Sequence, residues 1–178
     1  MPGDFTTPNE RYFAYADWVI RQIADRGILV FLYPAYLGYA GSDEGWYEEI
    51  IVNSPERCRE YGRYLGQRYR GFDNITWMMG GDRDPEKAQA ATQAMVAGIK
   101  EFDHRSLFTA HFQPEHSSVD VWPEAGWLDL NTTYTYKLVH DLLRQDYRRT
   151  PVRLFVLIES TYEGEHNASH AQIRRQAW

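Results

Sequence analysis

The chain has 178 residues, of which 43% are hydrophobic, so it can bury one sizeable core, and we expect a single domain over residues 1–178. The net charge of −6, from 25 acidic and 19 basic side chains without a large Lys and Arg cluster, argues against nucleic acid as a partner. No apolar run approaches the roughly 18 residues of a membrane span, and the start of the chain has no apolar signal-peptide core, so no membrane partner is expected and the compartment stays open.

The first predicted element is a helix that starts near Thr7. Thr7 can cap this helix, Pro8 fits its first turn, and Glu10 completes a capping box. Apolar residues then recur at helical spacing as far as Gly27, which suits the left-handed residue that closes a helix. The next run, residues 28–33, is short and apolar throughout, and this predicts a buried parallel strand.

The same couplet of helix and strand then repeats along the chain. Ser54-Pro55 predicts the start of a second helix, and Asp84-Pro85 predicts the start of a third helix with Asp84 as its cap. The remaining predicted elements are strands at residues 74–79 and 107–110, a weaker strand at 127–130, a helix at 137–148, the strongest strand at 152–158, and a last helix from about Ser169.

Helices that alternate with apolar strands predict an α/β fold, with a parallel sheet of about five strands and the helices outside it. A closed eight-stranded barrel takes about 250 residues and rarely fewer than about 200, so the chain is short for a complete (β/α)8 barrel. The other parallel architecture, a doubly wound sheet, usually has a Gly-rich phosphate loop after its first strand. The sequence contains no such loop, and Gly80-Gly81-Asp82 does not match one.

Polar residues follow the predicted strands, at the edge where parallel α/β proteins bind ligands. From these segments, and from the long aromatic-rich segment 34–53, we expect six residues to bind substrate: Tyr36, Trp46, Arg83, His111, Asn131 and Tyr134. Long loops at the active face are usually functional, although an aromatic cover over one end of the sheet is an alternative for this segment. For His111, the alternative is a structural role in a buried turn.

Two acidic residues are the strongest candidates for chemistry. Glu159 ends an apolar strand, where a carboxylate gains nothing from packing and costs free energy if it is buried unpaired. Its alternative role is an ion pair with Arg or a helix cap. Asp82 has no comparable structural role, whereas Asp84 does, and Gly80 and Gly81 allow the backbone before Asp82 to turn sharply and approach a ligand.

A pair of carboxylates across a cleft is the usual requirement for hydrolysis of a glycosidic bond, with one acting as the acid and the other as nucleophile or base. We therefore hypothesise a glycosidase with Asp82 and Glu159 as its catalytic pair. A separation of about 5–5.5 Å between the carboxyl groups predicts retention of anomeric configuration, and about 6.5–9.5 Å predicts inversion. The sequence leaves this separation open.

No metal and no other cofactor is expected. His166 and His170 are four residues apart, but Asn167 stands between them where a zinc-hydrolase helix has Glu. Nucleophilic hydrolases are disfavoured because no Ser has a Gly-x-Ser-x-Gly context and the single cysteine, Cys58, falls on the apolar face of a predicted helix.

Several motifs resemble those of the apiosidase-like glycoside hydrolases, which are related to cellulase-like (β/α)-barrel enzymes of clan A type. They are Pro8-Asn9-Glu10, Tyr12-Phe13, residues 61–66, 68–69 and 74–77, Gly80-Gly81-Asp82-Arg83-Asp84, residues 127–129, Asn131 and Tyr162-Glu163. The resemblance covers nearly the whole chain. It implies that Asp82 is the acid/base and Glu159 the nucleophile of a retaining enzyme that acts on a plant or microbial polysaccharide or oligosaccharide.

Compared with that family, the chain corresponds to an internal fragment, an incomplete (β/α)8 barrel that starts near the second helix and ends in the seventh. Such a sheet has two open edges, and open edges favour pairing with another chain. We therefore expect a homo-oligomer that completes the sheet across chains. The alternative function, from a different class, is a catalytically impaired carbohydrate-binding fragment that has kept the aromatic residues of the cleft.

Overall fold

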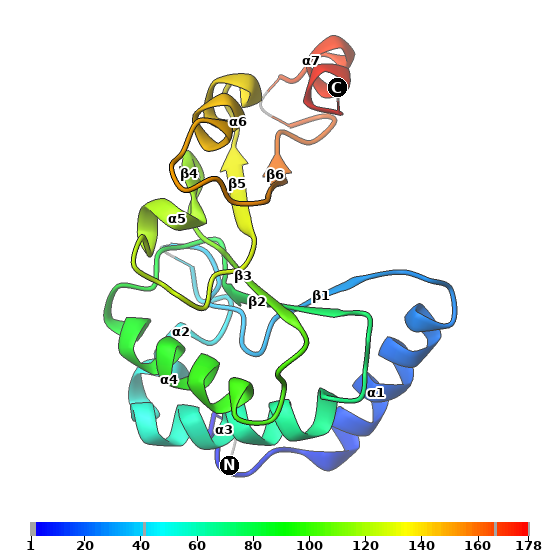
Figure 1. Cartoon of the computed structure of the whole chain (residues 1–178), viewed down its shortest axis with the longest axis vertical. Coiled ribbons are helices and arrows are strands. Elements are labelled where there is room, and N and C mark those ends of the chain that lie inside the picture. Colours follow the sequence, from blue (N-terminus) through cyan, green and yellow to red (C-terminus); the bar gives the residue numbers. More distant parts are fainter. Residues whose placement is uncertain (1–2, 41, 166, 178) are drawn as a thin grey trace.

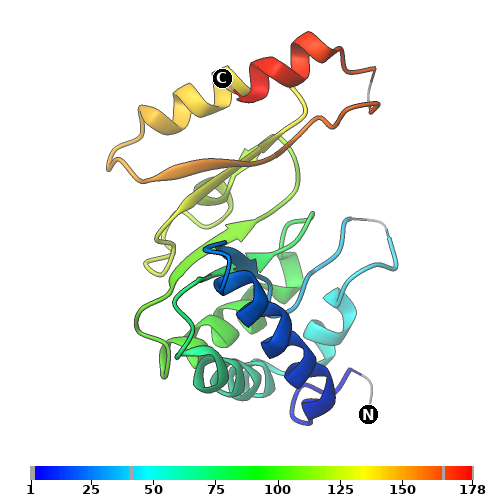
Figure 2. The same ribbon diagram turned by 90° about the vertical axis from the view of Figure 1, so that its right-hand side faces the viewer.

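The computed structural model describes residues 3–40, 42–165 and 167–177. In this α/β fold, helices α1, α3 and α4 lie on one side of a first sheet (Figure 1), and α6 and α7 lie on the outer side of a second sheet (Figure 2). The helices are α1 (Glu10–Ala24), α2 (Tyr47–Val52), α3 (Pro55–Tyr69), α4 (Gln89–Lys100), α5 (Ser118–Val121), α6 (Val139–Tyr147) and α7 (His170–Ala177), with a 3-10 turn at Glu86–Ala88. The strands are β1 (Val30–Leu32), β2 (Ile75–Gly80), β3 (Leu107–His111), β4 (His116–Ser117), β5 (Asn131–Thr135) and β6 (Phe155–Ser160).

Within the described residues, no helix has both the length and the apolar character needed to cross a membrane.

Five of the described strands follow the predicted parallel order. β2 pairs with β1 and with β3 in the first sheet, and β5 pairs with β6 in the second, all in parallel, whereas the short β4 is antiparallel to β5. The described residues of β3 and β5 form no ladder, but they lie side by side: the Thr109 hydroxyl donates to Leu130 O at 2.7 Å, and the Thr132 hydroxyl donates to Ala110 O. This seam of side-chain hydrogen bonds continues the row β1-β2-β3-β5-β6, which resembles part of a barrel wall.

Helix α1 is capped by Asn9, and the prediction of Thr7 as its cap is wrong. The Asn9 side chain accepts hydrogen bonds from the backbone N–H groups of Arg11 and Tyr12 at 3.1 and 3.3 Å. The Thr7 hydroxyl instead lies 3.5 Å from Asp4 O. Thr and Asn both cap helices well, so Thr7 and Asn9 were both suitable, and in the structure the cap is Asn9.

Asp84 does not cap the third helix, so that prediction is also wrong. The 3-10 turn Glu86–Ala88 precedes α4, and the side chain of Asp84 makes no cap to it. Instead, Asp84 Oδ2 accepts a hydrogen bond from the Gln113 side chain at 2.8 Å. Gln113 is far from Asp84 in sequence, and this contact could not be predicted from the local pattern around Pro85.

The predicted strand at residues 127–130 is wrong in position, because those residues form a turn and the strand is β5, Asn131–Thr135. Leu128 is buried in the core and Trp127 packs against it, so their apolar character reflects core packing outside a strand. The strand itself reads Asn-Thr-Thr-Tyr-Thr and is buried along its whole length. Helix α2 was also missed, since it lies inside the segment 34–53, which shows little periodicity.

The outer edges of β1 and β6 are open, because each of these strands pairs with one neighbour among the described residues. Apolar side chains that are more than half exposed precede both strands: Ile28 and Leu29 before β1, and Val152 and Leu154 before β6. Self-association through these edges stays a prediction. We expect multi-angle light scattering to give a mass above that of one chain, and a monomer at every protein concentration would contradict it.

Candidate active site

The Gly80-Gly81 pair brings Asp82 to the carboxyl edge of the first sheet, as the sequence predicted. Gly80 has a φ of +91°, and a Cβ atom there would lie 2.1 Å from His111 O. A Cβ atom on Gly81 would lie 3.0 Å from the ring of Tyr36. The Gly81 N–H donates to His111 O at 2.9 Å. The backbone thus passes through a space too narrow for side chains, and Asp82 is the first residue after it.

A bulge in β6 determines where Glu159 lies. Thr133 of β5 pairs with Leu157, but the next pair is Tyr134 with Glu159, so Ile158 is the extra residue. Bulges re-aim side chains and are common next to active sites. Because paired residues of neighbouring strands project to the same face, the bulge places Glu159 beside Tyr134.

His111 links the first sheet to Glu159. It is the last residue of β3 and is buried, with its Nδ1 2.9 Å from the Tyr33 hydroxyl. Its Nε2 lies 3.3 Å from Glu159 Oε2, a contact that is long and poorly aligned for a hydrogen bond. The Tyr162 hydroxyl donates to the other oxygen, Oε1, at 2.9 Å. Both oxygens of Glu159 therefore have a partner that restricts the orientation of the carboxylate.

Asp82 and Glu159 have pKa values that are shifted in opposite directions. Burial, with a further contribution from the negative charge of Glu159, raises the pKa of Asp82. Its Oδ1 is buried and has no hydrogen-bond partner among the described residues. The contact with His111 lowers the pKa of Glu159 against the effect of burial, and the hydrogen bond from Tyr162 lowers it further. Of the two carboxyl groups, Asp82 therefore holds its proton more readily and Glu159 ionises more readily.

Tyrosine side chains surround the two carboxyl groups. The Tyr134 hydroxyl donates to the Tyr136 hydroxyl at 2.7 Å, and its proximity to the two carboxyl groups lowers the pKa of both. Burial is the main cause that raises the pKa values of Tyr33, Tyr36 and Tyr134 themselves. Burial and the hydrogen bond to Glu159 raise the pKa of Tyr162 to about 12. These phenols are therefore neutral hydrogen-bond donors near pH 7.

The structure places three of the six predicted substrate-binding residues with the carboxylates. His111 and Tyr134 contact Glu159 as described, and the Tyr36 hydroxyl accepts a hydrogen bond from the Asp82 backbone N–H. Trp46 does not join this group. It precedes α2 and lines a separate pocket with the N-terminal segment and the start of α1.

The remaining two predicted substrate-binding residues lie elsewhere. The Arg83 guanidinium makes a cation–π contact with Tyr47, 3.5 Å from the centre of its ring. Asn131 was predicted to follow a strand, and this is wrong: it is the first residue of β5, at the opposite end from Glu159. It is buried and its Oδ1 accepts hydrogen bonds from the Ser118 hydroxyl and the Val119 N–H.

Two residues of the site were not among the predicted substrate-binding residues. Tyr33 lies directly after β1, so it belongs to the strand-end residues that the sequence could have ranked higher. Tyr162 is three residues beyond Glu159, and its spacing gave no signal of a hydrogen bond back to the carboxylate. Its contact depends on the turn after β6, which has no regular pattern.

The metal expectation stays a prediction, because His166 lies outside the described residues. Within residues 3–40, 42–165 and 167–177, no three His, Cys, Asp or Glu side chains are grouped so as to hold a metal ion. The candidate site consists of carboxyl, imidazole and phenol groups. Groups of these kinds can transfer protons, and a carboxylate can also act as a nucleophile.

Residues 1–178 match the family described as apiosidase-like, catalytic domain. The chain belongs to this family of glycoside hydrolases. The match confirms the family predicted from the sequence, and the apiosidase-like domain has the corresponding α/β fold. No curated protein matches the chain.

Two solved structures show the same fold as this apiosidase-like domain. One is a glycoside hydrolase family 5 protein from Bacteroides vulgatus ATCC 8482, with a TM-score of 0.72 and 21% identity over 85% of this chain and 35% of that protein. Another, described as a glycoside hydrolase, has a TM-score of 0.77 and 21% identity over 93% of this chain and 42% of its own. The domain therefore spans well under half the length of these structures, and the predicted partial barrel is confirmed.

Proposed function

We propose that this apiosidase-like domain hydrolyses a glycosidic bond in a plant or microbial polysaccharide or oligosaccharide, with Asp82 as acid/base and Glu159 as nucleophile. The observation that carries the proposal is that Asp82, which follows β2, and Glu159, in β6, meet at one site beside His111 and Tyr134. The opposite shifts of their pKa values, raised for Asp82 by burial and lowered for Glu159 by His111, agree with it. Two carboxyl groups whose environments push their pKa values apart can act at the same pH as acid and as ionised nucleophile. Membership of the family supports the same class of reaction.

The proposed reaction has two steps. In the first, a Glu159 carboxylate oxygen bonds to the anomeric carbon, the bond from that carbon to the leaving oxygen breaks, and Asp82 gives its proton to that oxygen. In the second, the Asp82 carboxylate takes a proton from water, and the water oxygen bonds to the anomeric carbon while the ester to Glu159 breaks. Each step inverts the configuration at the carbon, so the product retains it.

The electrostatic coupling of the pair suits the change of role of Asp82 between the steps. The negative charge of Glu159 is the second cause of the raised pKa of Asp82. Esterification of Glu159 removes that charge, so the pKa of Asp82 falls and its ionised form becomes available as a base. Tyr134, which contacts both carboxyl groups, helps to hold them in position.

Hydrolysis by the purified chain tests this proposal. We expect turnover in a panel of aryl glycosides and plant-derived oligosaccharides, and 1H NMR of the anomeric proton of the first-formed product to show retention. A first-formed product of inverted configuration would overturn the nucleophile role of Glu159. Sugar binding by calorimetry without any turnover would favour the alternative, a carbohydrate-binding domain.

Tyr162→Phe is expected to move the acidic limb of the pH profile of kcat/KM to higher pH. The variant removes the hydrogen bond that stabilises ionised Glu159, so the pKa of Glu159 rises and a higher pH is needed to ionise the nucleophile. The measurement is a pH–rate profile with an aryl glycoside. Tyr147→Phe, at an exposed tyrosine that ends α6, is the control, and equal acidic limbs in both variants would contradict the role of Tyr162.

A further inference from the structure

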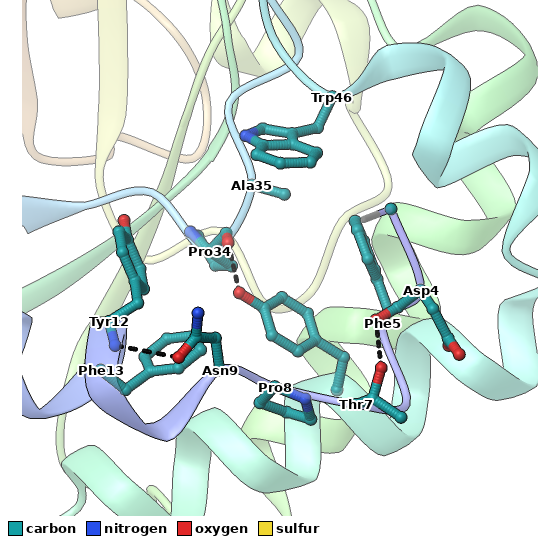
Figure 3. Close-up of a pocket in the computed structure, with 12 residues that line it drawn as sticks. Asp4, Phe5, Thr7, Pro8, Asn9, Tyr12, Phe13, Pro34, Ala35 and Trp46 are labelled. Atoms are coloured by element: carbon teal, nitrogen blue, oxygen red, sulfur yellow. Dashed lines mark hydrogen bonds between the residues drawn. The ribbon is translucent and has the colours of Figure 1, made fainter. Parts of the chain in front are cut away.

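A pocket of about 570 Å³ lies beside the candidate active site, and its aromatic lining has no role in the proposed chemistry. It is formed by the N-terminal segment, the start of α1 and the segment that follows β1 (Figure 3). Phe5, Phe13 and Tyr61 contribute buried or half-buried rings that belong to or pack on the core. The pocket is therefore fixed to the core of the domain.

Two aromatic side chains of the pocket are available to a ligand. Trp46 is 46% exposed and Tyr12 is 64% exposed, although both rings line a concave surface. Figure 3 shows the Trp46 indole above Ala35 on one side of the pocket and Tyr12 on the other. Large aromatic faces that stay open in this way suit a flat ligand with apolar faces, such as a sugar ring.

Polar groups between these rings can fix the orientation of such a ligand. The Asn9 carbonyl oxygen is used in capping α1, but its amide nitrogen has no hydrogen-bond partner among the described residues and points toward the Pro34 side of the pocket (Figure 3). The Tyr61 hydroxyl donates to Pro34 O at 3.0 Å, so its oxygen can still accept a hydrogen bond. One donor and one acceptor thus line a space to which five aromatic residues also contribute.

The charge of the pocket argues for a neutral ligand. Asp4 is the charged side chain that lines it, and hydrogen bonds from Thr6 lower the pKa of Asp4 and keep it ionised. No Lys or Arg is among the lining residues of the described chain. A uronic acid or phosphate would meet this negative charge, which Arg57 offsets only in part and from outside the lining, whereas a neutral sugar would not be repelled.

The pocket and the carboxylates share one short segment of backbone. Tyr33 and Tyr36 turn toward the site, where they contact His111 and Asp82, while Pro34 and Ala35 between them line the pocket. The Trp46 N–H donates to Tyr36 O at 2.7 Å, so the stacking residue is tied to the same segment. The pocket therefore adjoins the same segment that lines the candidate active site.

We propose that this pocket is an outer subsite that binds a neutral sugar unit of the substrate, stacked on Trp46 and hydrogen-bonded by the Asn9 amide. The link to catalysis rests on the proposed glycosidase function, but binding to the pocket does not. The subsite selects neutral oligosaccharides over acidic ones and contributes to substrate affinity without taking part in the chemistry.

Calorimetry on the inactive Asp82→Asn/Glu159→Gln chain tests the subsite without turnover. The probes are three neutral tetrasaccharides, of β-1,4-linked glucose, xylose and galactose, and one acidic tetrasaccharide of galacturonate. At least one neutral probe is expected to bind, with Trp46→Ala weakening it about tenfold or more. Trp18→Ala, which removes an exposed tryptophan stacked on Tyr15 elsewhere on α1, is expected to leave binding unchanged.

A second variant tests the amide without disturbing the helix. Asn9→Asp keeps the capping oxygen but replaces the donor with a carboxylate, so binding is expected to weaken several-fold while the circular dichroism of the chain is unchanged. The proposal is overturned if no neutral probe binds at millimolar concentration, if Trp46→Ala and Trp18→Ala bind alike, or if galacturonate binds as well as the neutral probes. Trp46-dependent binding in a chain whose wild type hydrolyses nothing would support the subsite and reject the glycosidase proposal.

Discussion

Asp82→Asn and Glu159→Gln are each expected to lower kcat/KM about 10²- to 10⁴-fold or more on a glycoside with a poor leaving group. Asp82→Asn removes the proton that the leaving oxygen needs, and Glu159→Gln removes the negative charge that attacks the anomeric carbon. Neither substitution changes the size of its side chain much. Steady-state kinetics on both variants, with circular dichroism to show that they fold, measures the effect.

Azide separates the roles of the two residues. Added azide can replace a missing nucleophile, so Glu159→Ala is expected to form a glycosyl azide of inverted configuration from an activated aryl glycoside. With Asp82→Ala, the glycosyl ester on Glu159 still forms, and azide attack on it gives a glycosyl azide of retained configuration. Exchanged configurations in the two variants would contradict the assignment.

Asp84→Asn is the matched control for Asp82→Asn. Asp84 is two residues away, and burial raises its pKa too, but its side chain binds Gln113 instead of facing Glu159. We expect Asp84→Asn to stay within a few-fold of wild-type activity. An equal loss in the Asp84 and Asp82 variants would show that the acid has been misassigned.

Gly80→Ala is expected to destabilise the fold by about 3–5 kcal/mol and to abolish activity. The substitution imposes two costs: a side chain at a φ of +91° and a Cβ atom 2.1 Å from the carbonyl oxygen of His111. That oxygen is backbone and cannot move without separating β2 from β3, which would also break the hydrogen bond from the Gly81 N–H. Urea unfolding of the purified variant measures the loss of free energy of unfolding.

Two other glycines separate the costs at Gly80. Gly27 has a φ of +68° with nothing within 4 Å of an added Cβ, so Gly27→Ala carries only the backbone cost of about 1–2 kcal/mol. Gly71 has an ordinary φ and open space, so Gly71→Ala is expected to be neutral or slightly stabilising. A loss at Gly80 no larger than that at Gly27 would show that the strands relax around the new side chain.

Most of the fold could be predicted because apolar runs coincide with strands in this chain. β2 is buried along its whole length and reads as a continuous apolar run, as a central parallel strand should. β5 is equally buried but is built from Asn, Thr and Tyr. The Thr132 hydroxyl donates across the seam to Ala110 O, and the Thr133 hydroxyl donates to Asp146 of α6. A strand of this composition cannot be recognised from hydrophobicity. The strand was therefore predicted at the apolar residues 127–130, directly before β5.

The positions of the candidate catalytic residues could be predicted because strand ends and glycines can be read locally. Gly80 and Gly81 identified the turn before Asp82, and the structure explains both by close backbone contacts. The bulge at Ile158 and the hydrogen bond from Tyr162 depend on pairing between strands and on turn geometry. The contact of Arg83 with Tyr47 depends on the position of α2, which the sequence did not reveal, and substrate binding by Arg83 stays a prediction.

The seam between β3 and β5 has a mechanical consequence for catalysis. Asp82 follows β2 on one side of it and Glu159 lies in β6 on the other, and the side-chain hydroxyls of Thr109 and Thr132 hold the two sides together where a backbone ladder would otherwise do so. Near the start of the seam, the Asp129 and Leu130 N–H groups also donate to Phe108 O. Beyond them, the hydroxyl contacts are single bonds on rotatable side chains, which resist shear less than a continuous ladder. A slide along the joint would change the gap between acid and nucleophile while leaving both sheets intact. Two threonines outside the candidate catalytic pair thus help to hold the distance on which retention or inversion depends.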